Sequence, residues 1–247
     1  MEIQLKENER IDDLQINNLK IIQNKNWFCF GIDSVLLSDF TKNIKNNSKI
    51  IDLGTGTGII SILLTAKTNP ESIIGVEIQP EVADMAKRSI YLNKLENKIN
   101  IINEDIRILD KKLPLAQYDV IVTNPPYMKE NTGLKNEDNT KLISRHEIKC
   151  TLENIANISS KLLKNHGEIY MVHRPDRLVD IMEIFRKYKL EIKEIRLVFP
   201  KEKEQANLIL IKAVKNGKPF LKISKPLYVY KETGDYTDEI LKIYNKI

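Results

Sequence analysis

The segment 49–60 constrains the fold of this chain more than any other. It reads Lys-Ile-Ile-Asp-Leu-Gly-Thr-Gly-Thr-Gly-Ile-Ile, so an apolar strand carrying Asp52 near its end runs into a turn and then into an apolar helix. Gly54, Gly56 and Gly58 stand at alternate positions, where glycine allows positive φ and has no Cβ to block a ligand. The start of the following helix offers free N–H groups to a carboxylate. The segment therefore predicts a strand–turn–helix unit that binds a nucleotide-like ligand.

The rest of the chain repeats this alternation of strand and helix. Ile- and Val-rich runs alternate with longer segments of helical period, which is typical of a parallel sheet covered by helices on both faces. The expected strands are 49–53, 72–78, 99–103, 118–123, 167–173, 191–198 and 207–214. The expected helices are 33–42, 58–67, 80–93, 147–163 and 175–188. The pattern predicts an α/β fold with a doubly wound seven-stranded sheet.

Acidic residues follow the second and third of these strands. Glu77, next to Ile78, could accept hydrogen bonds from both hydroxyls of a ribose, and Asp105, next to Ile106, could accept one from the amino group of an adenine. A nicotinamide-dependent dehydrogenase remains an alternative at this point, because a G-x-G-x-x-G fingerprint starting at Gly56 is nearly met, with Ser61 in the last place. A phosphate-binding P-loop is excluded, since no Gly-Lys-Ser/Thr follows.

The fourth strand runs directly into the tetrapeptide Asn124-Pro125-Pro126-Tyr127. The two prolines stiffen the backbone, so the carbonyl groups and the Asn124 side chain are presented rigidly. The Asn124 side-chain oxygen and the Pro125 carbonyl could accept the two N–H groups of a planar exocyclic nitrogen and aim its lone pair at a methyl donor. Tyr127 would stack on the flat acceptor. This displacement needs no metal ion and no covalent enzyme intermediate.

These residues resemble the class I S-adenosylmethionine-dependent methyltransferases that carry Asn-Pro-Pro-Tyr. Phe30 to Leu37 and Tyr228 to Tyr244 look like the valine tRNA adenine-37 N6-methyltransferase family. The resemblance implies a Rossmann-like sheet of seven strands with the last strand antiparallel, S-adenosyl-L-methionine as cofactor, and the anticodon arm of tRNA as partner. It also implies roles for single residues. Cofactor contacts would come from Asp33, Asp52, Gly54, Gly56, Gly58, Glu77, Ile78, Asp105, Ile106 and Asn124, with Asp33 near the methionine end, and catalysis from Asn124, Pro125 and Tyr127.

Other methyl acceptors also have a planar nitrogen whose lone pair is delocalised. A glutamine amide of a peptide release factor is one alternative, but the enzymes of that type usually have an added N-terminal helical domain, and only about 48 residues precede the first expected sheet strand here. An adenine in DNA is another, although no recognition domain is obvious unless 191–247 forms one. A non-catalytic module that binds the cofactor and recognises RNA is a third alternative, which the intact tetrapeptide argues against.

Basic residues near the expected site would bind the nucleic acid. A formal charge of +5 is compatible with a polyanionic partner but does not require one. Substrate contacts are expected from Pro126, Lys129, Arg145 and His146, and phosphate contacts would also come from Lys135, Lys141, Arg174, Arg177, Lys201 and Lys203, although each of these basic residues alone is more often a solvated charge. The polar stretch 129–141 is expected to be a loop, and its place beside the tetrapeptide would suit a lid, although the sequence does not settle whether it closes over the target. His146, His166 and His173 lie far apart, so no metal site is expected.

The chain is expected to form a single methyltransferase domain over 1–247. Residues 1–48 would cover the cofactor, although 30–37 could equally be a plain amphipathic helix capped by Asp33, and 215–247 would be a C-terminal extension. Cys29 and Cys150 form no CxxC pair and are expected to be packing residues. The start of the chain is polar, and no apolar run is long enough to span a bilayer. A monomeric cytoplasmic protein is therefore expected.

Overall fold

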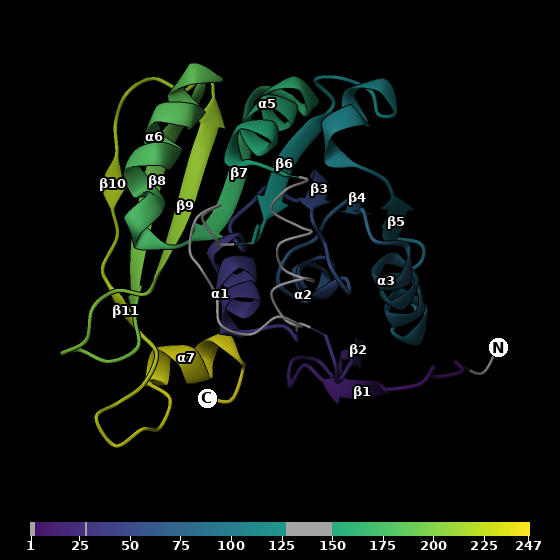
Figure 1. Ribbon diagram of the computed structural model, residues 1–247. Helices are drawn as coiled ribbons and strands as arrows, with labels where there is room; N and C mark the ends of the chain where they lie inside the picture. The colour runs from purple at the N-terminus through teal and green to yellow at the C-terminus, as the bar shows by residue number, and fades with distance from the viewer. Residues whose placement is uncertain (1–2, 28, 127–149) are drawn as a thin grey trace.

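The chain folds around one large sheet, shown in Figure 1. The computed structural model describes residues 3–27, 29–126 and 150–247. The seven longer strands of the sheet are β3 (Lys49–Leu53), β4 (Ser72–Glu77), β5 (Ile99–Asn103), β6 (Tyr118–Thr123), β7 (Leu163–His173), β8 (Leu190–Phe199) and β9 (Leu208–Lys215). They lie in the order β8-β9-β7-β6-β3-β4-β5, and β9 is antiparallel to both of its neighbours. The seven expected strands and the antiparallel last strand are confirmed.

Helices cover both faces of this sheet. On one face, the helices α1 (Ile32–Phe40), α2 (Ile59–Lys67), α3 (Pro80–Leu92) and α7 (Asp238–Ile243) share a core with inward side chains of the strands. On the other face, α5 (Leu152–Leu162), α6 (Leu178–Lys187) and the 3-10 helix η1 (Ile106–Lys111) enclose a second core. The middle strands are apolar on both sides because each side packs against a helical layer. This arrangement confirms the doubly wound α/β class.

The helix ends differ from the expected ones in ways that capping explains. Thr151 caps α5, with its side chain accepting from the Asn154 backbone N–H at 3.2 Å in a capping box, so α5 starts after the expected position 147. Residues 147–149 lie outside the described residues. The expected helix 175–188 begins instead as a 3-10 turn, η2 (Pro175–Arg177), before α6.

Four short strands were not expected from the sequence. Two of them, β10 (Lys222–Ile223) and β11 (Leu227–Tyr228), extend the sheet along β8 and make it nine-stranded. The other two, β1 (Glu9–Asp13) and β2 (Lys20–Asn24), form a separate antiparallel hairpin. Strands of two residues are too short to show alternation, and β1 is almost entirely polar, so neither pair has the pattern of a buried strand.

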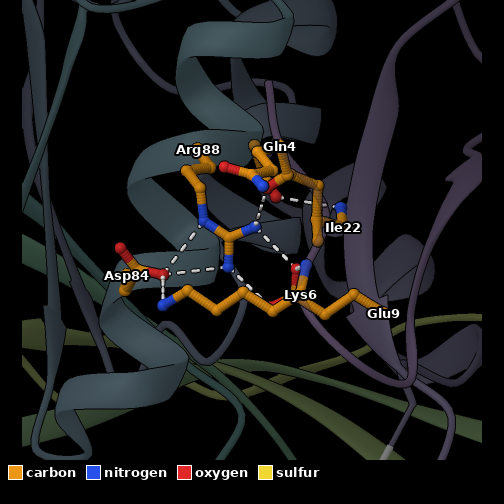
Figure 2. Close-up of polar contacts among 7 residues, drawn as sticks. Gln4, Lys6, Glu9, Ile22, Asp84 and Arg88 are labelled. Carbon is orange, nitrogen blue, oxygen red and sulfur yellow. Dashed lines mark hydrogen bonds and ion pairs between the residues drawn. The ribbon is translucent and has the colours of Figure 1, made fainter. Parts of the chain in front are cut away.

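Polar contacts hold the hairpin against α3, as Figure 2 shows. The Arg88 guanidinium on α3 forms a bidentate ion pair with the Glu9 carboxylate, with both N–O distances at 2.6 Å. Arg88 also donates to Asp84 at 2.9 Å, and the Lys6 ammonium reaches the same Asp84 carboxylate at 2.8 Å. The Glu9 side chain is only 4% exposed, so this pair is largely removed from water. The hairpin is thereby fixed beside α3, next to the segment that leads into α1.

No helix in the described part of the chain is long and apolar enough to cross a membrane.

Candidate cofactor and acceptor site

The carboxyl ends of four adjacent strands meet at one edge of the sheet. Because β6, β3, β4 and β5 are neighbours and parallel, the segments that follow them lie side by side. The glycine turn follows β3, Glu77 ends β4, and Asp105 and Asn124 follow β5 and β6. The Thr123 hydroxyl donates to the Leu53 carbonyl at 2.9 Å and ties the ends of β6 and β3 together.

The glycine turn has the backbone that the sequence predicts. Gly54, Gly56 and Gly58 have φ values of 72°, 58° and 91°, in the left-handed region that favours glycine. The backbone N–H groups of Gly54 and Thr55 both donate to the Val76 carbonyl, at 3.0 and 2.9 Å, which anchors the turn to β4. A Cβ added at Gly54 or Gly56 would have no atom within 4 Å, so the backbone faces open space there.

Asp52 lies beneath the turn and does not line its open face. Its side chain is fully buried, and one carboxylate oxygen accepts from the hydroxyls of Thr55 at 2.6 Å and Ser61 at 2.8 Å. Burial raises the pKa of this carboxyl to about 6, against the opposing effect of the two hydroxyl donors. In this arrangement Asp52 braces the turn from below and has no surface for the direct cofactor contact that the resemblance implies.

Glu77 connects the turn to the start of α3. Its carboxylate accepts from the Gly56 backbone N–H at 3.1 Å and from the Gln79 backbone N–H at 2.9 Å. The side chain is 5% exposed, and the following Ile78 is half-buried. The acid expected to bind a ribose therefore lies beside the glycine turn, and its two oxygens hold two backbone segments together.

Asp105 caps the first turn of η1. Its carboxylate accepts from the Arg107 backbone N–H at 2.9 Å and forms an ion pair with the Arg107 guanidinium at 2.6 Å. Ile106, the next residue, is 8% exposed and packs in the second core. The expected adenine-binding acid thus follows β5 at this edge of the sheet, with Arg107 bound to its carboxylate.

Asn124 meets the start of α1. Its amide Nδ2 donates to the Asp33 carboxylate at 3.1 Å and to the Ser34 hydroxyl at 3.3 Å. Both partners are buried, with Asp33 8% and Ser34 3% exposed. Pro125 is buried and Pro126 exposed. The structure therefore brings the expected segment 30–37 to the expected tetrapeptide.

The remaining expected residues include some that the structure does not describe. Tyr127, Lys129, Lys135, Lys141, Arg145 and His146, and with them the expected loop 129–141, lie outside the described residues. His173 is 4% exposed, and burial lowers its pKa to about 4, while its Nδ1 accepts from the Arg174 backbone N–H. His166 is exposed near the amino-terminal end of β7. Among the described residues, no group of three or more potential metal ligands is found.

The two cysteines are both free thiols and half-buried. Burial raises the pKa of the Cys150 thiol to about 12, so it is protonated at neutral pH.

Sequence reasoning missed the residues that support the expected ones. Ser34, Thr55 and Ser61 bind Asn124 or Asp52 through their hydroxyls, and Arg107 binds Asp105. One signal was present: Ser61 is a polar residue within the apolar run that opens α2, and it is fully buried. A buried hydroxyl needs a hydrogen-bond partner, which here is the equally buried Asp52.

Comparison with known proteins supports the fold and the methyltransferase family that the sequence indicates. The family model described as "Methyltransferase small domain" matches residues 18–194. A tRNA1(Val) (adenine(37)-N6)-methyltransferase from Bacteroides fragilis is 31% identical over 142 residues, which is 58% of each chain. A protein of the same name from Porphyromonas gingivalis is 29% identical over 180 residues, or 70% of each chain.

Solved structures resemble the fold at low sequence identity. A predicted O-methyltransferase from Agrobacterium tumefaciens has a TM-score of 0.70 and 20% identity, over 87% of this chain and 96% of that one. The M. jannaschii TYW2 structure in complex with AdoMet has a TM-score of 0.57 and 16% identity, over 86% and 88% of the two chains. The architecture, the glycine turn and the family match agree, and the family match covers more than half of the chain. The chain belongs to the methyltransferase small domain family.

Proposed function

We propose that this protein transfers a methyl group from S-adenosyl-L-methionine to the N6 atom of an adenine in tRNA, namely adenine-37 beside the anticodon of valine tRNA. The names of the Bacteroides and Porphyromonas relatives support this substrate. The chain spans 58% of the length of the Bacteroides relative that it matches, so the activity and substrate are carried over as a proposal. A monomer acting in the cytoplasm without a metal ion is part of the same proposal.

The residues at the glycine turn fit the cofactor. The open space in front of Gly54 and Gly56 leaves room for a ligand on the backbone, and the start of α2 would face its carboxylate. Glu77 and Asp105 would hold the ribose and adenine, with Ile78 and Ile106 beside them. When bound, the cofactor supplies a methyl group activated by a positively charged sulfur. In this proposal Asp52 supports the turn through the hydroxyls of Thr55 and Ser61 and is not a direct ligand.

Asn124 and Pro125 would prepare the target nitrogen. An exocyclic amine of adenine is a weak nucleophile because its lone pair is delocalised into the ring. The Asn124 side-chain oxygen and the Pro125 carbonyl would accept its two N–H bonds, increase the electron density on nitrogen and orient the lone pair. The observation that carries the proposal is the position of Asn124 at the end of β6, beside the glycine turn, with its amide nitrogen held at 3.1 Å by Asp33.

Methyl transfer to total tRNA tests the proposal. Purified protein is incubated with methyl-labelled cofactor and tRNA from a strain that lacks the gene, and the labelled nucleoside is identified and mapped. We expect N6-methyladenosine at position 37 of valine tRNA. Label on a release-factor glutamine or on a DNA adenine, with none on tRNA, would contradict the tRNA assignment and favour the alternative acceptor. Cofactor binding without transfer to any acceptor would favour the non-catalytic module.

A further inference from the structure

The orientation of the Asn124 amide is determined by residues of α1. We propose that Asp33 is a positioning residue: it holds the amide nitrogen of Asn124 so that the amide oxygen faces the target amine. The inference rests on the proposed function, because it assigns Asp33 a part in the same reaction. It differs from the role that the sequence suggested, which was a contact near the methionine end of the cofactor.

The chemistry of the contact allows only one orientation of the amide. An ionised carboxylate only accepts hydrogen bonds, whereas an asparagine amide has a donor end and an acceptor end. The Asp33 Oδ2 atom lies 3.1 Å from Nδ2 of Asn124, and the Ser34 Oγ atom lies 3.3 Å from the same nitrogen. With Nδ2 turned toward these two oxygens, Oδ1 points away from them, at the other end of the planar amide group. A flipped amide would present a donor to the N–H bonds of the acceptor and would repel them.

The carboxylate that holds the amide is itself fixed. Its Oδ1 atom accepts from the Ser34 backbone N–H at 3.0 Å. A Cβ at Gly31 would lie 2.8 Å from this Oδ1 atom, so a glycine at position 31 leaves the space that the carboxylate occupies. The residues that follow Ser34, Val35 to Leu37, are at most 1% exposed and anchor α1 in the core. A rigid support therefore runs from the core through Asp33 to Asn124.

Asp33 belongs to a different element of the fold from the glycine turn. It approaches Asn124 from α1, whereas the turn and its bracing residues belong to β3, β4 and α2. Replacing a residue that acts only through Asn124 slows the chemical step and leaves cofactor affinity unchanged. Replacing a direct cofactor ligand lowers that affinity. The two roles are therefore distinguishable by measuring binding and transfer on the same variants.

The test compares Asp33→Ala, Asp33→Asn and a control variant, Asp39→Asn. Asp39 lies on the same helix but pairs with Lys42 and Lys67, so the control removes a negative charge from α1 without touching Asn124. Affinity for S-adenosylhomocysteine is measured by titration calorimetry, and the single-turnover rate of methyl transfer is measured on valine tRNA. We expect Asp33→Ala to slow transfer roughly 10- to 100-fold, as a misplaced reacting group does, with affinity within about 2-fold of wild type.

The isosteric variant Asp33→Asn and the NMR resonances of the Asn124 amide complete the test. Asp33→Asn keeps a side-chain oxygen that accepts from Nδ2, so its transfer rate should lie between those of wild type and Asp33→Ala. The NH₂ resonances of Asn124, identified by their absence in Asn124→Ala, should shift in both Asp33 variants and stay in place in Asp39→Asn. This NMR measurement requires neither enzymatic activity nor bound substrate.

Three results would overturn the inference. A loss of S-adenosylhomocysteine affinity that matches the loss of rate in Asp33→Ala would make Asp33 a cofactor ligand. An unchanged transfer rate, or unchanged Asn124 NH₂ resonances, would show that the contact does not position the amide. If wild-type protein methylates no tRNA while the Asn124 resonances still respond to Asp33→Asn, the proposed substrate fails and the contact itself stands.

Discussion

At the scale of single residues, the site depends on side chains that do not reach its surface. Asp52 is fully buried beneath the glycine turn, and its carboxylate is held by two hydroxyls from the turn and the helix that follows. Burial of the charged form is unfavourable, so the pKa of Asp52 is raised to about 6. The turn therefore includes a group whose charge state changes just below neutral pH.

This shift predicts that Asp52→Asn stabilises the protein in a pH-dependent way. Because the folded pKa exceeds the unfolded value of 3.8, the native state binds more protons between these values, and the contribution of Asp52 to stability falls as pH rises from about 4 to about 6. The difference between the two pKa values corresponds to roughly 3 kcal/mol, as an order of magnitude. Asparagine does not ionise, so the free energy of unfolding of the variant should match that of wild type near pH 4 and exceed it by up to about 3 kcal/mol at pH 8.

Urea unfolding of both proteins from pH 4 to pH 8 measures this difference. Parallel stability curves for wild type and Asp52→Asn across the range would show that Asp52 titrates normally in the folded state.

Two site residues should separate binding from transfer. Asn124→Ala should abolish methyl transfer, because it removes the acceptor for the target amine, and should leave S-adenosylhomocysteine affinity nearly unchanged. Glu77→Ala should reduce that affinity roughly 10-fold or more, because it removes the expected ribose acceptor and releases the Gly56 backbone. Calorimetry and single-turnover kinetics on the two variants provide the check. Loss of cofactor binding in Asn124→Ala would contradict its assignment to the acceptor side.

At the scale of elements, the N-terminal hairpin is held by charge rather than by an apolar face alone. Ile22 packs against Val82 and Met85 of α3, and the ion pair between Glu9 and Arg88 lies alongside. The bidentate contact with Arg88 lowers the pKa of Glu9 below its usual value. Its stabilising effect is present above the unfolded pKa of Glu9 and is lost as pH falls through the folded pKa.

Arg88→Ala should therefore loosen the hairpin. The variant leaves Glu9, which is 4% exposed, without its main partner, and we expect a loss of about 1–3 kcal/mol in the free energy of unfolding at pH 7. The loss should shrink as pH falls through the lowered folded pKa of Glu9, where the carboxylate becomes protonated. Hydrogen exchange at Ile21 and Ile22 should speed up more than exchange in β3. Arg10→Ala is the matched control, since Arg10 pairs with Asp12 on the same hairpin and is 45% exposed. If Arg88→Ala and Arg10→Ala lower the free energy of unfolding equally, the buried pair of Glu9 and Arg88 is not the source of the stability.

At the scale of the whole molecule, the parallel strands direct basic residues to one edge. Arg174 and Arg177 follow β7, and Lys201 and Lys203 follow β8, and both strands run in the same direction as β6. These residues therefore lie at the edge that carries Asn124, although Arg177 is paired with Asp180 at 2.7 Å. A polyanion bound at Asn124 would extend across this edge.

Affinity for tRNA should consequently fall steeply with salt. Each phosphate contact contributes roughly 0.7–0.9 to the slope of log affinity against log salt, so replacing both Lys201 and Lys203 with alanine should flatten the slope by about 1.5. A second double variant, with Lys189 and Lys218 replaced, is the control, because these exposed residues lie at the opposite edge, before β8 and after β9. Filter binding at several salt concentrations measures both slopes. Identical slopes for the two double variants would remove Lys201 and Lys203 from the RNA surface.

The sequence by itself determined the sheet and the position of Asn124 at the end of one of its strands. Buried parallel strands are continuous apolar runs, so β3, β5 and β6 could be located to the residue, and glycines at alternate positions predicted a turn whose φ values are positive. Such patterns report how one segment is buried and bent. They also placed Asn124 at the end of a strand, where the fold collects functional groups.

Only the tertiary structure decided which polar groups meet. Asp33 and Asn124 are far apart in the sequence, as are Glu9 and Arg88, and the burial of Asp52 beneath its own turn depends on the helix that packs above it. Hydrogen bonds and ion pairs need atoms within about 3 Å in a suitable direction, and that geometry follows from the packing of whole elements. Periodicity along a chain is set by the environment of each residue, whereas a contact between two chain-distant side chains is set by how the layers are assembled.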